Sequence, residues 1–194
     1  RDFLTEVKKI AGLRHPNLVG YLDSGQLQLD EEIRPFLVTE RCALSLADHG
    51  RRSATGTLTI PETLAVVADL AAGLAHLHQQ GLIHRDIKPG NALWSEGRWK
   101  LADFGPMRDL SATGNYHRAG MLMGTPLFMA PELFVSMLAT PASDIYAMGV
   151  LAHLCVTGNH LHTGAGPILI HNITSQPATV DPRLPAAFHQ LVSR

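Results

Sequence analysis

The spacing of apolar residues at the start of the chain predicts an amphipathic helix over residues 1–13. At about 100° per residue its apolar positions share one arc, and they are Phe3, Val7, Ile10 and Leu13. Glu6 falls inside this arc, where a carboxylate is costly unless a cation pairs with it. Two interpretations stay open: a cationic partner from elsewhere in the protein, or a partly exposed Glu6 at the edge of the apolar stripe.

Two short β-rich stretches follow the predicted helix, at residues 19–22 and 36–39. The acidic turn at residues 30–32 separates them, so they are predicted to pair as an antiparallel hairpin. From about residue 43 the pattern becomes mainly helical.

The longest helical pattern begins at a capping box formed by Thr59 and Glu62, with Pro61 in the first turn. Its apolar residues recur at intervals of three and four, and they are Leu64, Val67, Ala68, Ala71, Leu74 and Leu77. Gly81 is predicted to end this helix. The pattern continues with two short strands and two helices, predicted at residues 92–94, 99–102, 143–157 and 185–194.

Composition and charge narrow the function classes. The 194 residues are 45% hydrophobic, which is enough to build a core and excludes intrinsic disorder. Lys and Arg number 16 against 17 Asp and Glu, so we expect no nucleic-acid partner. No apolar stretch reaches the roughly 18 uninterrupted residues of a membrane span. Cys42 and Cys155 are widely separated, which favours a reducing cytoplasmic location over a disulfide framework.

Eleven histidines require that a metal site be considered. His76 and His78 are two positions apart on a predicted helix, so they point to different sides. His160 and His162 lie in a loop without Cys or carboxylates at ligand spacing. Structural histidines are therefore a better interpretation than a zinc site.

Three motifs carry candidate chemistry. Residues 84–91 read His-Arg-Asp-Ile-Lys-Pro-Gly-Asn and follow the long helix. Residues 103–105 read Asp-Phe-Gly after the second of the two short strands, and residues 130–132 read Ala-Pro-Glu. In this order and on these elements the chain resembles the protein kinase family, from its first residue to its last.

The resemblance implies an α+β, bilobal kinase-like fold, with a partial small lobe of a helix plus strands and a mainly helical large lobe. Residues 1–40 would be the remnant of the small lobe, 41–42 the hinge, and 43–194 a large lobe truncated at its C-terminal helices. The glycine-rich loop and strand lysine of the family would lie before Arg1, and an arginine that holds Glu132 would follow Arg194. Residues 1–194 alone are therefore expected to be a fragment and inactive.

The resemblance also assigns roles in transfer of a phosphoryl group from ATP. Asp86 would accept or orient the proton of the attacking hydroxyl, Lys88 would contact the transferring phosphoryl group, and Thr125 would lie beside Asp86. Asn91 and Asp103 would hold Mg²⁺, which prefers carboxylate and amide oxygens.

Further positions match the nucleotide site of the family. Glu6 would pair with the small-lobe lysine, Thr39 would be the gatekeeper behind the adenine pocket, and Leu93 would lie under the adenine ring. Glu40 to Cys42 would form the hinge, whose backbone contacts adenine. An apolar column linking the lobes would comprise Ile10, Tyr21, His84 and Phe104, and Asp144 would anchor the catalytic loop.

Lys88 and the Gly-Thr-Pro at residues 124–126 resemble the Ser/Thr class of the family, so a protein substrate with a Ser or Thr acceptor is expected. Arg85 and Arg108 could bind an activating phosphate. Met121 stands near the usual phosphothreonine position, so Thr113 is the first candidate for phosphorylation, ahead of Ser111 and Tyr116. Two alternatives stay open: a non-catalytic pseudokinase-like scaffold, and a kinase-like enzyme that phosphorylates a small molecule.

Overall fold

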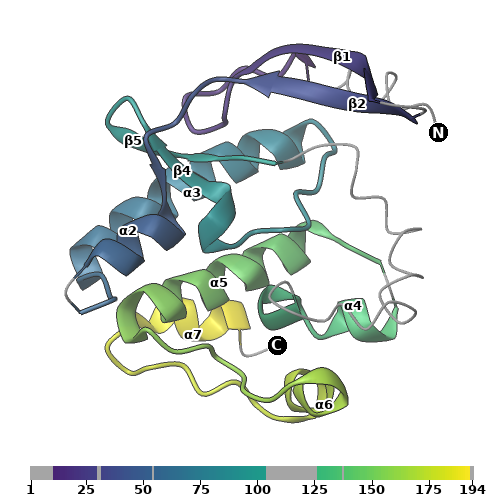
Figure 1. Cartoon of the computed structure of the whole chain (residues 1–194). Coiled ribbons are helices and arrows are strands. Elements are labelled where there is room, and N and C mark those ends of the chain that lie inside the picture. The colour runs from purple at the N-terminus through teal and green to yellow at the C-terminus, as the bar shows by residue number, and fades with distance from the viewer. Residues whose placement is uncertain (1–10, 30–31, 54, 104–125, 137, 193–194) are drawn as a thin grey trace.

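The computed structural model describes residues 11–29, 32–53, 55–103, 126–136 and 138–192. The predicted N-terminal helix, with Glu6 and Ile10, lies almost entirely outside these residues, and so do Phe104, Thr125 and the candidate phosphorylation sites. The described residues form one mixed α and β fold with two small sheets and a larger helical part (Figure 1).

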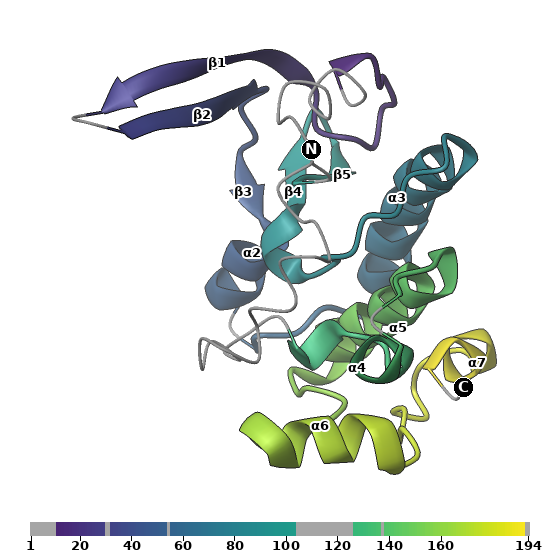
Figure 2. The same ribbon diagram turned by 90° about the vertical axis from the view of Figure 1, so that its right-hand side faces the viewer.

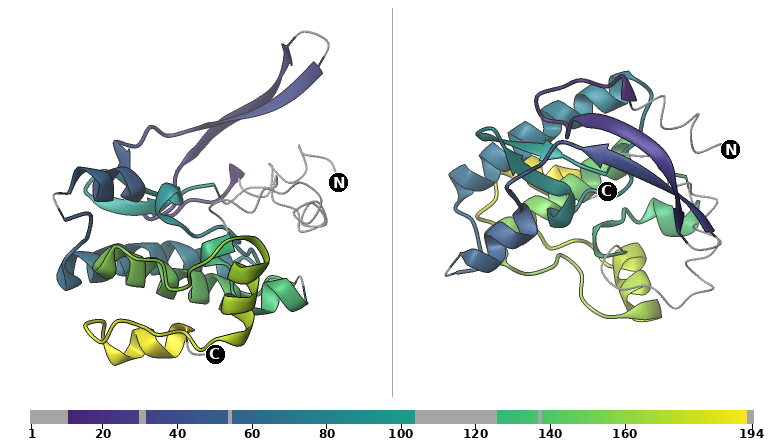
Figure 3. Two further views of the ribbon diagram at one scale, coloured as in Figure 1. Left: turned by 60° about the horizontal axis from the view of Figure 1, so that its bottom comes forward. Right: turned by 45° about the horizontal axis from the view of Figure 1, so that its top comes forward.

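The first sheet is the predicted hairpin. Strands β1 (Tyr21–Leu29) and β2 (Glu32–Thr39) pair antiparallel, with Tyr21 opposite Thr39. Figure 3 shows the two strands extending away from the helical part. The prediction of a hairpin is confirmed, but the first strand begins two residues later than predicted and is much longer. The reason is that Val19 is used elsewhere, since its N–H donates to the carbonyl of Leu101 at 2.8 Å.

The second sheet contains β3 (Leu44–Ser45), β4 (Ala92–Ser95) and β5 (Arg98–Leu101), in that spatial order and antiparallel. The turn between β4 and β5 has positive φ at both central residues, 52° at Glu96 and 78° at Gly97, as a type I′ turn requires. The two predicted strands at 92–94 and 99–102 are thus confirmed with small shifts. Strand β3 was not predicted, because the pattern after residue 43 is mainly helical.

Helix α2 (Leu46–Arg52) is short, and helix α3 (Ile60–Gln79) is the long helix that the sequence predicts. The capping box is present, because Thr59 Oγ1 accepts from the Glu62 amide and the Glu62 side chain accepts from the Thr59 amide. Gly81 follows the helix with a φ of 70°, as expected. By length and composition α3 could cross a membrane, but one face of it is buried in the core of this fold.

The remaining helical elements are η1 (Pro89–Asn91), η3 (Pro126–Phe128), α4 (Glu132–Val135), α5 (Pro141–Thr157), α6 (Gly166–Ser175) and α7 (Ala186–Val192). Figure 2 shows α6 and α7 on the far side of α5 from the sheets. Helix α5 is buried on nearly all sides and forms the centre of the core with α3. Helix α6 was not predicted, because Leu169 and Ile173 are its only buried positions.

A close backbone contact fixes the second sheet against α3. A Cβ on Gly73 would lie 2.5 Å from the carbonyl oxygen of Asn17, so no other residue fits there without a shift. The same carbonyl accepts from the Leu101 amide at 2.8 Å, and the Asn17 side chain donates to the Trp99 carbonyl at 3.0 Å. Strand β5 and helix α3, which precedes the loop at residues 84–91, are therefore held together. Because β5 pairs with β4, the strand that follows this loop, the contact positions both ends of the loop.

Candidate active site

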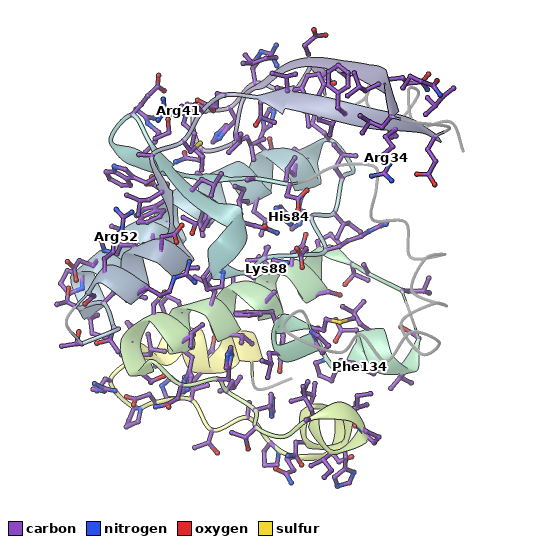
Figure 4. The ribbon with its side chains drawn as sticks, viewed as in Figure 1. Arg34, Arg41, Arg52, His84, Lys88 and Phe134 are labelled. Atoms are coloured by element: carbon purple, nitrogen blue, oxygen red, sulfur yellow. The ribbon has the colours of Figure 1, made fainter. Side chains whose placement is uncertain are left out.

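The loop at residues 84–91 brings three of the predicted site residues together. The Asn91 Nδ2 donates to Asp86 Oδ2 at 2.6 Å and to the Asp86 carbonyl at 2.8 Å. The Lys88 Nζ lies 2.8 Å from the same Asp86 Oδ2. Figure 4 shows Lys88 beside the short η1 turn, above α5. Asp86 is only 4% exposed, so its charge is held by fixed donors and not by bulk water.

These contacts also orient the Asn91 amide. Both atoms that face Asn91 from Asp86 are acceptors, so the nitrogen of the amide must face them. The Asn91 Oδ1 therefore points away from Asp86 and stays available as a hard oxygen ligand.

Asp103 is exposed and lies two residues after the end of β5. The amide of Ala102 donates to the Asn91 carbonyl at 2.8 Å, so the residue that precedes Asp103 is hydrogen-bonded to Asn91. Asp103 has a φ of 63° and Arg85 a φ of 71°. Such left-handed conformations cost free energy for residues other than glycine and gather at functional sites.

One buried carboxylate holds the start of the loop. Asp144, in the first turn of α5, accepts from the amides of His84 and Arg85, both at 2.8 Å. The His78 Nε2 lies 2.8 Å from the same Asp144 side chain, which is 1% exposed. The expected anchor is present, and it joins α3, the loop and α5 at one point.

The histidines near the loop have structural partners. The His84 Nδ1 accepts from the Asp86 amide at 3.3 Å, so its Nε2 carries the proton and donates to the Ala102 carbonyl at 3.0 Å. His76 stacks on His15 with ring centroids 5.2 Å apart, whereas His78 contacts Asp144. His76 and His78 therefore point to different sides of α3, as predicted.

The predicted hinge is fixed by an ion pair that the sequence reasoning missed. The Lys100 Nζ lies 2.8 Å and 3.0 Å from the two Glu40 carboxylate oxygens and 3.1 Å from Glu96 Oε2. Glu40 also accepts from the Gly20 amide at 2.6 Å. A lysine between Trp99 and Leu101 in a predicted strand was the one signal in the sequence, because a buried lysine requires a carboxylate. The sequence does not show which carboxylate, since Glu40 lies 60 residues away.

Burial raises the pKa of Glu40, but the hydrogen bonds from Lys100 and Gly20 and the Lys100 charge outweigh it, so the pKa lies below its ordinary value. For Lys100, burial lowers the pKa, and the bonds to Glu40 and Glu96 raise it above its ordinary value. Both groups are therefore charged at neutral pH. Their attraction joins the end of β2 to β5.

The other predicted nucleotide contacts lie around this pair. Thr39 ends β2 and is exposed, and Leu93 is half-buried in β4 opposite Lys100. Cys42 is half-buried, and burial together with the Glu40 charge raises the pKa of its thiol. The gatekeeper and adenine-contact roles of these residues stay predictions.

Comparison with known proteins places this geometry in a family. The family described as "Protein kinase domain" matches residues 1–186. Serine/threonine-protein kinase PknA of Mycobacterium tuberculosis is 31% identical over 193 residues, which is 98% of this chain and 44% of PknA. Serine/threonine-protein kinase PksC of Streptomyces coelicolor is 33% identical over 203 residues, 99% of this chain and 36% of PksC. The chain spans less than half the length of each relative.

Proposed function

Because the chain belongs to the protein kinase family, we propose that it carries the catalytic half of a serine/threonine protein kinase. The proposed reaction is transfer of the ATP γ-phosphoryl group to a Ser or Thr hydroxyl of a protein. The observation that carries the proposal is the Asp86 carboxylate, held between Lys88 and Asn91 in a buried loop.

Each residue has a role in this proposal. Asp86 accepts a hydrogen bond from the acceptor hydroxyl and orients it for attack. Lys88 supplies a cation within reach of the transferring phosphoryl group, at a position fixed by its ion pair with Asp86. Thr125 is proposed to position Asp86, and Glu6 to hold the small-lobe lysine. The hinge from Glu40 to Cys42, with Thr39 and Leu93, is proposed to bind adenine.

The donor set fits the Mg²⁺ that protein kinases generally use with ATP. A carboxylate on Asp103 and the free amide oxygen of Asn91 are hard oxygen ligands on two adjacent segments. Bound Mg²⁺ would neutralise phosphate charge that develops during transfer. Asn91 keeps its oxygen available because its nitrogen is committed to Asp86.

The pseudokinase alternative is disfavoured by the same residues. A scaffold has no need for a buried Asp86 with two fixed donors. The four groups that the reaction needs are all present in the sequence, and they are Asp86, Lys88, Asn91 and Asp103. The small-molecule alternative is disfavoured by the relatives, whose names state serine/threonine-protein kinases. A cytoplasmic location for these residues is part of the proposal and rests on two free cysteines.

The proposal is tested with the full-length protein that contains these residues, using radiolabelled ATP and a mixture of Ser, Thr and Tyr peptides. We expect transfer to Ser and Thr peptides, and we expect Asp86→Asn to reduce kcat by at least about 100-fold with little change in ATP affinity. Arg34→Gln, on an exposed surface ion pair of β2, is the matched control. Retention of kcat within about threefold in Asp86→Asn would contradict the role of Asp86.

A further inference from the structure

Three histidines of the helical part take no part in the proposed reaction, although two of them are buried. His153 of α5 is 7% exposed, and His162, between α5 and α6, is 6% exposed. His160 belongs to the same connecting segment and is exposed, and its ring meets the Phe128 ring edge-on with centroids 5.7 Å apart. Imidazole has an ordinary pKa near neutral pH, so mild acid acts on such rings before it acts on other side chains.

The hydrogen bond of His153 requires an uncharged ring. Its Nδ1 accepts from the Asp181 amide at 3.3 Å and so joins α5 to the segment that precedes α7. A backbone amide N–H can only donate, and a protonated imidazole carries a proton on both nitrogens. Binding of a proton at His153 therefore abolishes this bond and leaves two donors facing each other.

His162 is bonded to the interior of the core. Its Nε2 lies 3.1 Å from the hydroxyl of Tyr146, which is 5% exposed. Burial and the charge of Glu132 raise the pKa of Tyr146 to about 12, so this hydroxyl keeps its proton. Glu132 lines the same cavity as His162, but its Oε1 accepts from Ser143 at 2.8 Å. A proton on His162 therefore adds a charge to the core next to an uncharged partner.

The charges around the rings favour their uncharged form. Burial lowers the pKa of His153 below its ordinary 6.5, against the charge of Asp181, which raises it. Both Asp181 oxygens are already bonded to Arg183, at 2.9 Å. The charges of Arg183 and His160 lower the pKa of His153 further. Burial and the charge of His153 lower the pKa of His162. The free energy that keeps this region closed is therefore complete above pH 6.5 and is lost as pH falls below that value.

The rings are connected to the loop that carries Asp86 through Phe128. Phe128 belongs to η3 and is 7% exposed, and it lines one small cavity together with Arg85 and Asp86. His160 contacts the Phe128 ring from the segment that His162 fixes to α5. Release of His162 therefore also removes support from Phe128 beside Asp86.

We propose that His153, His160 and His162 form a pH-sensitive switch, which holds η3 against the catalytic loop at neutral pH and releases it when His153 and His162 bind protons. The proposal rests on the proposed kinase function. Phosphoryl transfer should then decrease reversibly as pH falls from about 7.5 to about 5.5. The KM for ATP should change little, because the Lys100 ion pair that holds the hinge stays charged over this range.

The first test measures kcat of the full-length protein at the two ends of this pH range, with radiolabelled ATP and a Ser peptide. His153→Asn keeps an acceptor near the place of Nδ1, and His162→Gln keeps a polar group near the place of Nε2, but neither takes up a proton. We expect kcat of the unmodified protein to be lower by about tenfold or more at the acidic end, and that of the double variant to change by less than about threefold. His171→Gln, on an exposed position of α6, is the matched control and should keep the full decrease.

Hydrogen exchange gives a second readout, which does not depend on catalysis. The protection factors of the Asp181 amide and of the amides in η3 should decrease by about tenfold or more at about pH 5.5 in the unmodified protein. In the double variant they should keep their values from neutral pH. Protection that is unchanged by acid in the unmodified protein, or that decreases equally in the double variant, would overturn the proposal.

Two variants of His160 test the connection to the loop. His160→Ala removes the ring contact with Phe128 and should lower kcat by about threefold or more at neutral pH. His160→Phe keeps an aromatic ring at this place and should retain kcat. Equal kcat in His160→Ala and the unmodified protein would show that Phe128 does not connect the histidines to the loop, and the proposal would be wrong.

The outcomes separate this proposal from the one on which it rests. If no Ser or Thr peptide is phosphorylated at either pH, the kinase proposal itself fails, and the exchange measurement alone decides whether the histidines form a switch. If peptides are phosphorylated but kcat depends on pH in the same way in the unmodified protein and the double variant, the kinase proposal stands and the switch is wrong.

Discussion

Replacement of Lys100 by methionine should destabilise the protein through the Glu40 carboxylate that it leaves behind. The Lys100 side chain is 6% exposed, while Glu40 is 23% exposed and Glu96 is 76% exposed. Removal of one partner from a fully buried ion pair costs about 3–5 kcal/mol. Because Glu40 keeps contact with water, and Glu96 is largely screened, we expect a smaller loss of about 2 kcal/mol in Lys100→Met.

That loss corresponds to a decrease in Tm of about 4–8 °C for a domain of this size. Calorimetry of Lys100→Met, Glu40→Gln and the double variant gives the coupling free energy of the pair, which should be at least about 1 kcal/mol. The exposed pair of Arg34 and Glu32 on β2 is the matched control, and the same cycle on it should give much weaker coupling. Additive effects of Lys100→Met and Glu40→Gln would refute the argument.

The contribution of this pair should also depend on pH. The pKa of Glu40 is lowered below its ordinary 4.5 in the folded protein, so its share of the stability is present above 4.5 and is lost as pH falls through the lowered value. The pKa of Lys100 is raised above 10.5, so its share is present below 10.5 and is lost as pH rises through the raised value. The difference in Tm between the unmodified protein and Lys100→Met should therefore be largest near neutral pH and should shrink below about pH 4.

Three further predictions concern the proposed metal ligand Asp103, the anchor of the loop at Asp144, and the long helix α3. Asp103→Asn should raise the Mg²⁺ concentration needed for half-maximal activity and lower kcat, because a carboxylate ligand is lost; an unchanged Mg²⁺ dependence would exclude Asp103 as a ligand. Asp144→Asn replaces one acceptor of a loop amide by a donor and should lower kcat by about tenfold or more while the KM for ATP changes little, as steady-state kinetics will show. Thr59→Ala should lower the free energy of unfolding by about 1 kcal/mol in urea titrations, because α3 loses its N-cap, whereas Thr59→Ser should be close to neutral.

Local patterns were sufficient to predict the elements whose ends are set by short-range chemistry. The capping box at Thr59 and the glycine at position 81 fix the ends of α3 through contacts within one turn, so no tertiary information was needed. Helix α5 was predicted at residues 143–157 and runs from Pro141 to Thr157, so only its first two residues were missed; it is buried on nearly all sides and has no periodic apolar stripe that marks its first turn. The start of β1 depends on a bond between Val19 and Leu101, which are distant in sequence.

The candidate site shows the same division. Asp86, Lys88 and Asn91 are within six residues of one another, so the motif alone implied that they meet. Lys100 was missed because its partner Glu40 lies 60 residues away, and only the fold brings them together. Helix α6 was missed because just two of its residues face the core, which is too weak a signal to separate a helix from a loop.

The anchoring of the loop by Asp144 has a consequence for how the site can move. The amides of His84 and Arg85 both donate to a carboxylate that is 1% exposed and stands on the central helix of the core. Their hydrogen exchange with solvent therefore requires separation of the loop from α5, an opening on the scale of global unfolding. The main chain directly before Asp86 therefore keeps one arrangement for as long as α5 stays packed in the core.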